Sequence, residues 1–323
     1  MKTVFTLGPA SEEKNLIKSL YQVADRFRLN VAHLSSSQLR DWLDNLMDIF
    51  EKIEQKSPVI LDLQGAKMRI GDYPTTTQIP EKVTLIYASD SQTVKQIPVP
   101  HQDLFCSLQA EDILSLNEGR VQLKVLHAHD DYAEALVLSQ GKLSAYKGIN
   151  RVNHPIPFSQ LTEKDEQAIQ IGLDYPLIQF ACSFVLTGQE VFQLRPLVTH
   201  AHLIAKLERP EAMKHLREID HLFDELWFCR GDMGEQAGLK ALGALQAHFV
   251  AAFDQLSRPK FIAGQLLEHM THFPRPTRSE IVHLYDVKKA GFDGIVLSDE
   301  TAIGCCPIKV AEFVKYFFDK SDY

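Results

Sequence analysis

The stretch that decides the fold is IAKLERPEAMKHLREIDHLFDELWFCRGD, residues Ile204–Asp232. Two apolar runs at its ends, Leu203–Leu207 and Glu225–Phe228, each stop at charged residues, which is typical of parallel strands covered on both faces. Between them, Pro210–Ile219 begins with proline and carries apolar residues at helical spacing, which favours a helix. The stretch therefore predicts one strand-helix-strand unit.

Charged residues follow both strands of this unit. Lys206 and Glu208 lie at the carboxyl end of the first strand, and Arg230 and Asp232 lie at the same end of the second, where α/β proteins keep their sites. The two carboxylates could hold Mg²⁺ or Mn²⁺, which prefer oxygen ligands, beside the positive charge of Lys206. A surface ion network is the competing interpretation, and these residues alone do not decide between the two.

The same rhythm of strands and helices runs through most of the chain. Strands are expected to begin at Lys2, Leu29, Val59, Leu177, Leu203, Glu225, Lys260 and Gly294. The second of them is expected over Leu29–Leu34. Eight strands that mostly alternate with helices predict an α/β fold, a TIM (β/α)8 barrel.

One region interrupts this rhythm. Segments of period 2 without helices, such as Arg120–Ala128 and Tyr132–Leu138, predict a small all-β domain inserted after the third strand. The expected domains are a barrel of residues 1–71 and 147–323 and an inserted domain of residues 72–146.

Composition excludes some classes of protein. The formal charge of -8, without a run of Lys or Arg, argues against binding nucleic acid. No apolar segment reaches the roughly 20 residues that span a bilayer, and the amino terminus reads as a strand rather than a signal peptide. We expect a cytoplasmic protein without a membrane partner.

Seven motifs occur in the order that they have in a known enzyme family. They are TLGPAS, ILDLQGAKMRIGD, LIAKLERPEAMKHLREID, WFCRGDMG, FIAGQLLEHM, PRPTRSE and GIVLSDETAIG. On these residues the chain resembles the pyruvate kinase family over almost its whole length. The resemblance implies a TIM barrel whose inserted β domain acts as a lid, and the carboxy-terminal regulatory domain of the family is expected to be absent.

The resemblance also implies roles for individual residues. Glu208 and Asp232 match the metal-binding carboxylates, and Lys206 matches the lysine that supports phosphoryl transfer and the enolate. Arg69 matches the arginine of the GPEIR-type motif and is expected to act in catalysis. Further substrate-binding positions are expected at Gly231 and Met233, in a loop whose backbone contacts the substrate carboxylate, and at Ser183, Arg230, Ser298 and Glu300.

Several positions depart from the family pattern. His33 stands where the AR(L)NFSHG-type motif has arginine, Gln64 replaces a lysine and Leu186 replaces a basic residue, so we expect weaker binding of phosphate. Gly264 replaces the threonine associated with proton delivery to the enolate. Lys67 replaces a glutamate, as in members that work without K⁺, so K⁺ is expected not to be required.

Three functions stay open at this point. The first is a pyruvate-kinase-like phosphotransferase that moves a phosphoryl group between phosphoenolpyruvate and ADP, with Mg²⁺ or Mn²⁺. The second is a metal-dependent lyase, aldolase or decarboxylase that acts through a pyruvate enolate, and the third is a non-catalytic ligand-binding or regulatory homologue. The expected partners are a phosphoenolpyruvate-like or pyruvate-like small molecule and ADP or ATP, and self-association into a homo-oligomer stays open.

Overall fold

The chain divides into two compact units. The computed structural model describes residues 1–54, 56–65, 68–117, 119–152 and 161–319. The first unit contains Met1–Gly65, Gln160–Arg230 and Leu245–Tyr323, and the second unit contains Ala66–Ser159 and Gly231–Ala244. The domain limits expected from the sequence stay a prediction.

Eight parallel strands close into a barrel in the first unit. In order around the barrel they are β1 (Lys2–Leu7), β14 (Gly294–Leu297), β13 (Lys260–Ala263), β12 (Glu225–Cys229), β11 (Leu203–Leu207), β10 (Ile178–Cys182), β3 (Val59–Asp62) and β2 (Arg26–Asn30). Side chains on alternate positions of these strands face the interior, where Ile204, Trp227 and Phe261 belong to one buried cluster. The TIM barrel predicted from the sequence is confirmed.

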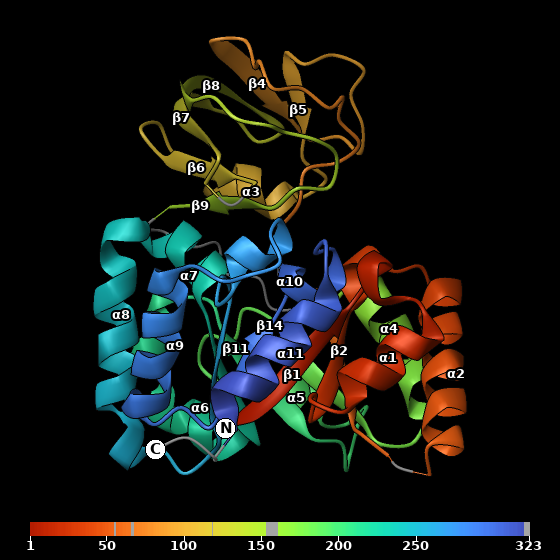
Figure 1. The fold of residues 1–323 in the computed structure, drawn as a ribbon. Helices are drawn as coiled ribbons and strands as arrows, with labels where there is room; N and C mark the ends of the chain where they lie inside the picture. Colours follow the sequence, from red (N-terminus) through yellow and green to blue (C-terminus); the bar gives the residue numbers. More distant parts are fainter. Residues whose placement is uncertain (55, 66–67, 118, 153–160, 320–323) are drawn as a thin grey trace. The chain divides into compact units, whose positions relative to one another are not determined.

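Helices lie outside the strands of this barrel (Figure 1). They are α1 (Lys14–Tyr21), α2 (Ser36–Lys52), α4 (Glu163–Leu173), α5 (Val191–Leu194), α6 (Leu216–Leu222), α9 (Arg278–Ala290), α10 (Asp299–Ala302) and α11 (Pro307–Phe318). A further helix, α8 (Leu239–Ala251), begins in the second unit and ends in the first. Capping boxes begin three of them, because Ser35, Thr162 and Thr277 each accept a backbone N–H of the first turn. A polar side chain before an apolar periodic segment thus sets where each of these helices starts.

The second barrel strand lies earlier than the sequence pattern predicted. The expected strand over Leu29–Leu34 is wrong, since β2 ends at Asn30 and Val31–His33 forms a 3-10 turn, η2. The Asn30 side chain accepts the Ala32 N–H at 3.2 Å and ends the strand. Arg26 of β2 is buried in the barrel, where its Nη2 donates to Glu225 at 2.7 Å.

Two further elements differ from the expected ones. Pro210–Ile219, expected as one helix, divides into the 3-10 turn η3 (Pro210–Lys214) and α6. The segment after β12 was expected as a loop, but it forms the helix α7 (Arg230–Ala237), which begins in the first unit and continues in the second.

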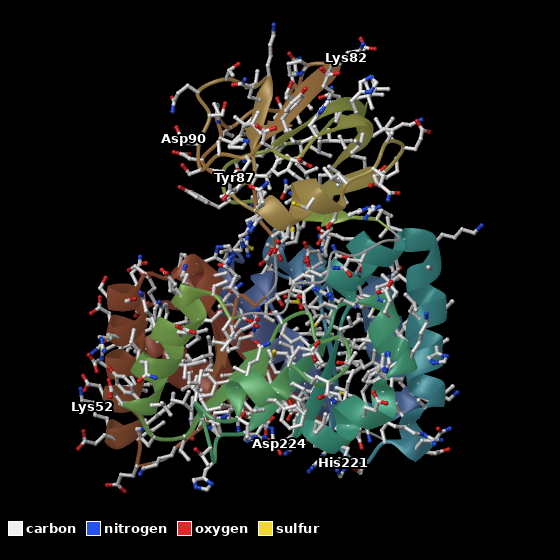
Figure 2. All side chains as sticks on the ribbon, turned by 180° about the vertical axis from the view of Figure 1, so that it is seen from behind. Lys52, Lys82, Tyr87, Asp90, His221 and Asp224 are labelled. Atoms are coloured by element: carbon white, nitrogen blue, oxygen red, sulfur yellow. The ribbon has the colours of Figure 1, made fainter. Side chains whose placement is uncertain are left out.

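The second unit contains a six-stranded sheet in the order β5-β4-β8-β7-β6-β9. Its strands are β4 (Lys82–Ile86), β5 (Gln96–Pro98), β6 (Ile113–Leu116), β7 (Val121–Ala128), β8 (Tyr132–Ser139) and β9 (Ile149–Arg151). The inserted β domain is confirmed, and it also contains the short helix α3 (Gln102–Ser107). Figure 2 labels Lys82, Tyr87 and Asp90 on this unit. Within the described part of the chain, no helix is long and apolar enough to cross a membrane.

Candidate active site at the end of the barrel

Lys206 of β11 is the centre of a buried polar cluster in the first unit. Its Nζ lies 3.0 Å from Oδ1 of Asp62 and 3.0 Å from Oε1 of Glu208, and it donates to the Ser183 hydroxyl at 2.9 Å. The Lys206 side chain is only 11% exposed. In Figure 2, Asp224, which directly precedes β12, marks the edge of the barrel where the strands begin. The Lys206 cluster lies at the opposite, carboxyl-terminal edge, where barrel enzymes place their sites.

The charges of this cluster stabilise one another. Burial opposes the charged form of Lys206, but the carboxylates of Asp62 and Glu208 outweigh it and raise the pKa of the ammonium. Burial also opposes ionisation of Asp62, but Lys206 and Arg28 outweigh it and lower the pKa of the carboxyl. The site therefore holds a permanent ammonium between two carboxylates at neutral pH.

Arg28 of β2 is a member of this cluster that the sequence interpretation missed. Its Nε donates to Oδ2 of Asp62 at 2.8 Å, its Nη2 donates to the same oxygen, and its Nη1 donates to the Thr6 hydroxyl at 2.7 Å. Burial lowers the pKa of Arg28, but Asp62 raises it further, so the guanidinium stays charged. A forked, permanent cation thus stands beside Lys206 and the buried carboxylates.

Glu208 is held in place from the neighbouring strand end. It is 1% exposed, and its Oε2 accepts the Phe184 N–H at 2.8 Å, just after Ser183. Glu208 is therefore fixed in orientation by Lys206 and by the Phe184 backbone.

The buried carboxylate of Glu208 offers the oxygen donors that a divalent cation prefers. Among the described residues, no three His, Cys, Asp or Glu side chains form a group that could hold a metal ion. The predicted carboxylate ligands are Glu208 and Asp232, and their joint binding of a metal stays a prediction. Substrate oxygens and water would take the other positions, which is usual for Mg²⁺.

The residues around Asp232 lie on a helix and not in the loop expected from the sequence. Gly231, Asp232 and Met233 belong to α7, and Asp232 is in its first turn. These three residues fall in the second unit, while Lys206 and Glu208 fall in the first. The pairing of Asp232 with Glu208 therefore stays a prediction.

Arg69 is bound to other residues of the second unit. Its backbone N–H donates to Nε2 of His101 at 3.1 Å, and its Nη1 donates to the Tyr146 carbonyl at 2.8 Å. Burial lowers the pKa of His101, which favours the neutral ring that accepts this N–H. A catalytic role for Arg69 stays a prediction.

Ser298 and Glu300 meet through the backbone after β14. The buried Glu300 carboxylate accepts the Ser298 N–H at 2.7 Å and the Leu267 N–H at 3.1 Å. Burial raises the pKa of Glu300. These contacts make Glu300 a support for two loops at the barrel end, and its substrate-binding role stays a prediction.

Comparison with known proteins places this architecture in a family. Residues 1–311 match the family description "Pyruvate kinase, barrel domain". The chain belongs to the pyruvate kinase family. A crystal structure of pyruvate kinase from Pyrobaculum aerophilum aligns with all of this chain and 74% of its own, with a TM-score of 0.87 and 27% identity.

Curated pyruvate kinases from bacteria and archaea match nearly the whole chain. One from Agrobacterium vitis is 29% identical over 99% of this chain and 69% of its own length. One from Thermococcus litoralis is 28% identical over 97% of this chain and 68% of its own length. The chain thus spans about two thirds of the length of these relatives.

The expected replacement of the phosphate-binding arginine by His33 stays a prediction. His33 is exposed in η2, beyond the end of β2. Arg28, Leu29 and Asn30 spell the RLN of the pyruvate kinase motif at the end of β2, and Arg28 contacts Asp62. The register of β2 therefore gives this chain an arginine at the site.

The other positions that depart from the family pattern are Gln64, Gly264 and Lys67, and each lies in a different part of the chain. The backbone N–H of Gln64 donates to Asp165 at 2.7 Å, which fixes the turn after β3. Gly264 follows β13 and has a φ of 91°, in the left-handed region that favours glycine. Lys67 lies outside the described residues, so its relation to K⁺ stays a prediction.

Proposed function

We propose that this chain is a pyruvate-kinase-like phosphotransferase that moves a phosphoryl group between phosphoenolpyruvate and ADP through a metal-stabilised enolate. The observation that carries the proposal is the buried ammonium of Lys206 between Asp62 and Glu208, with the Arg28 guanidinium on the other oxygen of Asp62. Phosphoryl transfer depends mainly on positioning and on neutralising charge. Two permanent cations at one barrel end supply that neutralisation.

Divalent metal use is typical of the pyruvate kinase family, and we assign the metal here to Glu208 and Asp232. A bound Mg²⁺ or Mn²⁺ would neutralise negative charge on the substrate. The fixed geometry of Glu208, held by Lys206 and by the Phe184 N–H, orients one of the two carboxylates before substrate arrives.

The protein's own groups would share the remaining work. Lys206 and Arg28 would stabilise the charge that develops on the phosphoryl group and on the enolate oxygen. The helix α7 begins with Arg230, Gly231 and Asp232, whose backbone N–H groups lie in its first turn. They would bind the substrate carboxylate, because a helix N-terminus favours negative charge.

The proposal includes activity without K⁺. Both oxygens of Asp62 already face a cationic side chain, with Lys206 at 3.0 Å from Oδ1 and Arg28 Nε at 2.8 Å from Oδ2. The charge of the Asp62 carboxylate is therefore balanced by protein side chains, and no K⁺ ion is needed to neutralise it. Lys67 adds a further positive charge nearby in sequence.

A second candidate function follows from Gly264 and Gln64. The family pattern has a threonine at position 264 and a lysine at position 64, and this chain has neither, whereas it keeps the lysine assigned to the enolate, Lys206. This balance favours a metal-dependent lyase or decarboxylase that works through a pyruvate enolate.

One assay separates the two candidates. Pyruvate release is measured from phosphoenolpyruvate and from oxaloacetate, each with and without ADP, with Mg²⁺ or Mn²⁺, and with K⁺ replaced by tetramethylammonium. The kinase proposal predicts release from phosphoenolpyruvate that requires ADP and persists without K⁺. Release from oxaloacetate alone, independent of ADP, would select the lyase instead.

A further inference from the structure

Arg230, at the junction of β12 and α7, is held by two other elements of the first unit. Its Nε donates to the Gly264 carbonyl at 2.9 Å, and its Nη2 donates to that carbonyl and to the Gln265 carbonyl, the latter at 2.9 Å. Its Nη1 lies 2.5 Å from Nε2 of His283 on α9. The guanidinium therefore ties the start of α7 to the loop after β13 and to a helix outside the barrel.

The contact with His283 fixes the state of that ring. A guanidinium can only donate, so the Nε2 of His283 must accept. The ring is then neutral and carries its single proton on Nδ1. A protonated His283 would have a donor at Nε2 and would repel Arg230 at this distance.

The surroundings of His283 favour the neutral form. Burial and then the charge of Arg230 lower the pKa of His283, while Asp286 on the same helix opposes them. From the loop after β13, the groups that meet Arg230 are the uncharged carbonyls of Gly264 and Gln265. Burial also lowers the pKa of Arg230 to about 10, while the buried Glu300 carboxylate, whose own pKa is raised by burial, opposes this effect. The guanidinium therefore remains charged near neutral pH.

We propose that His283 is a positioning residue of the site, which holds the Arg230 guanidinium on the β13 loop while neutral and releases it when protonated. The proposal rests on the proposed function, because Arg230 directly precedes Gly231 and the predicted metal ligand Asp232. Release of Arg230 frees the residue that comes directly before Gly231 and two positions before Asp232 in the chain. Activity therefore falls in acid through His283, although His283 is not assigned any contact with substrate.

Two substitutions test separately the hydrogen-bond acceptor and the charge at position 283. His283→Gln keeps an acceptor that cannot be protonated, and it should retain activity at pH 7.5 while losing the fall in kcat on the acid side. His283→Lys places a permanent cation against Arg230, and it should lower kcat about tenfold or more at pH 7.5, because small displacements at a reacting centre cost this much. His248→Asn, at an exposed position of α8, is the matched control and should keep the wild-type pH profile.

Two measurements on the full chain do not need turnover. The histidine ring signals are titrated by NMR, and His283 should titrate below the ordinary histidine pKa of about 6.5 in the wild type and move up in Arg230→Gln. The affinity for Mn²⁺ is measured by EPR, and His283→Lys should weaken it about tenfold while His283→Gln does not, since outer contacts of a metal site have effects of this size.

The outcomes distinguish this inference from the proposed reaction. A His283 titration at the ordinary histidine pKa of about 6.5 that does not respond to Arg230→Gln would overturn the contact on which the inference stands. Unchanged Mn²⁺ affinity in His283→Lys, or an acid limb that survives in His283→Gln, would overturn the positioning role. If phosphoenolpyruvate is not converted but the NMR and Mn²⁺ results are as expected, the reaction assignment fails and the role of His283 stands.

Discussion

Arg28 holds Asp62 across the carboxyl ends of the neighbouring strands β2 and β3, with Nε 2.8 Å from Oδ2. The Asp62 side chain is 2% exposed, and its other oxygen lies 3.0 Å from Nζ of Lys206. One carboxylate thus fixes two cations at the barrel end. The Asp62 carboxylate therefore contributes both to the stability of the barrel and to the charge balance of the site.

Replacing Asp62 should destabilise the protein strongly. Asp62→Asn keeps the shape but leaves the cations Arg28 and Lys206 buried with one less negative charge, which typically costs about 3 kcal/mol or more. The free energy of unfolding is measured by urea denaturation. Asp174→Asn is the control, because Asp174 pairs with Arg40 at the surface and such pairs contribute about 0–1 kcal/mol. Equal effects of the two substitutions would contradict the assigned geometry.

Arg28, and not His33, should govern the use of phosphoenolpyruvate. Arg28→Gln removes a forked donor at the site and should lower kcat/KM about 100-fold. His33→Gln changes an exposed ring and should leave kcat/KM within about twofold. Steady-state kinetics of both variants tests which of the two residues, Arg28 or His33, contributes to the use of phosphoenolpyruvate. A large loss in His33→Gln with little change in Arg28→Gln would support the alignment that the sequence alone suggested.

Why the sequence alone misplaced this strand is clear from its residues. Arg26 and Arg28 make RFRLN look solvent-exposed, whereas Leu29–Leu34 looks apolar. The carboxylates that neutralise the two arginines, Glu225 and Asp62, lie 199 and 34 residues away. A pattern within a short window cannot show partners at that separation, although the RLN triplet was a usable signal.

The rest of the barrel was easier to predict, because the signals for its strands and helices lie within short segments of the sequence. The apolar runs at β11 and β12 and the caps at Thr162 and Thr277 mark their elements without distant partners. In contrast, α7 was missed because RGDMGEQA contains two glycines, which disfavour a helix. The Lys206 cluster could be expected from the strand ends, but the contacts that fix it, such as the Phe184 N–H on Glu208, required the fold.

Restoring threonine at position 264 should cost stability. The φ of Gly264 is 91°, and a side chain in the left-handed region costs about 1–2 kcal/mol. Gly264→Thr and Gly264→Ala should therefore both lower the melting temperature, measured by circular dichroism. Alanine isolates the backbone effect from that of the hydroxyl. If neither substitution lowers the melting temperature, this backbone conformation is not required.

Stability should also fall in mild acid through His283. Its pKa is lowered in the folded protein by burial and by Arg230, so folding favours the neutral ring. This contribution is complete above the unfolded value, about 6.5, and is lost as the pH falls below it towards the lower folded value. Urea denaturation between pH 5 and pH 8 should show a loss that is smaller in His283→Gln. A wild-type slope that persists unchanged in the variant would assign the loss to other groups.

The central claim is that the buried Lys206 cluster serves phosphoryl transfer between phosphoenolpyruvate and ADP. Lys206→Met removes the ammonium that lies 3.0 Å from both Asp62 and Glu208. Its effect is measured as ADP-dependent pyruvate release from phosphoenolpyruvate with Mg²⁺ in the absence of K⁺, and circular dichroism confirms that the variant is folded. We predict clear release by the wild type and a loss of about 1,000-fold in folded Lys206→Met, the upper range for one lost electrostatic contact. No ADP-dependent release by the wild type, or equal release by the variant, would contradict the account.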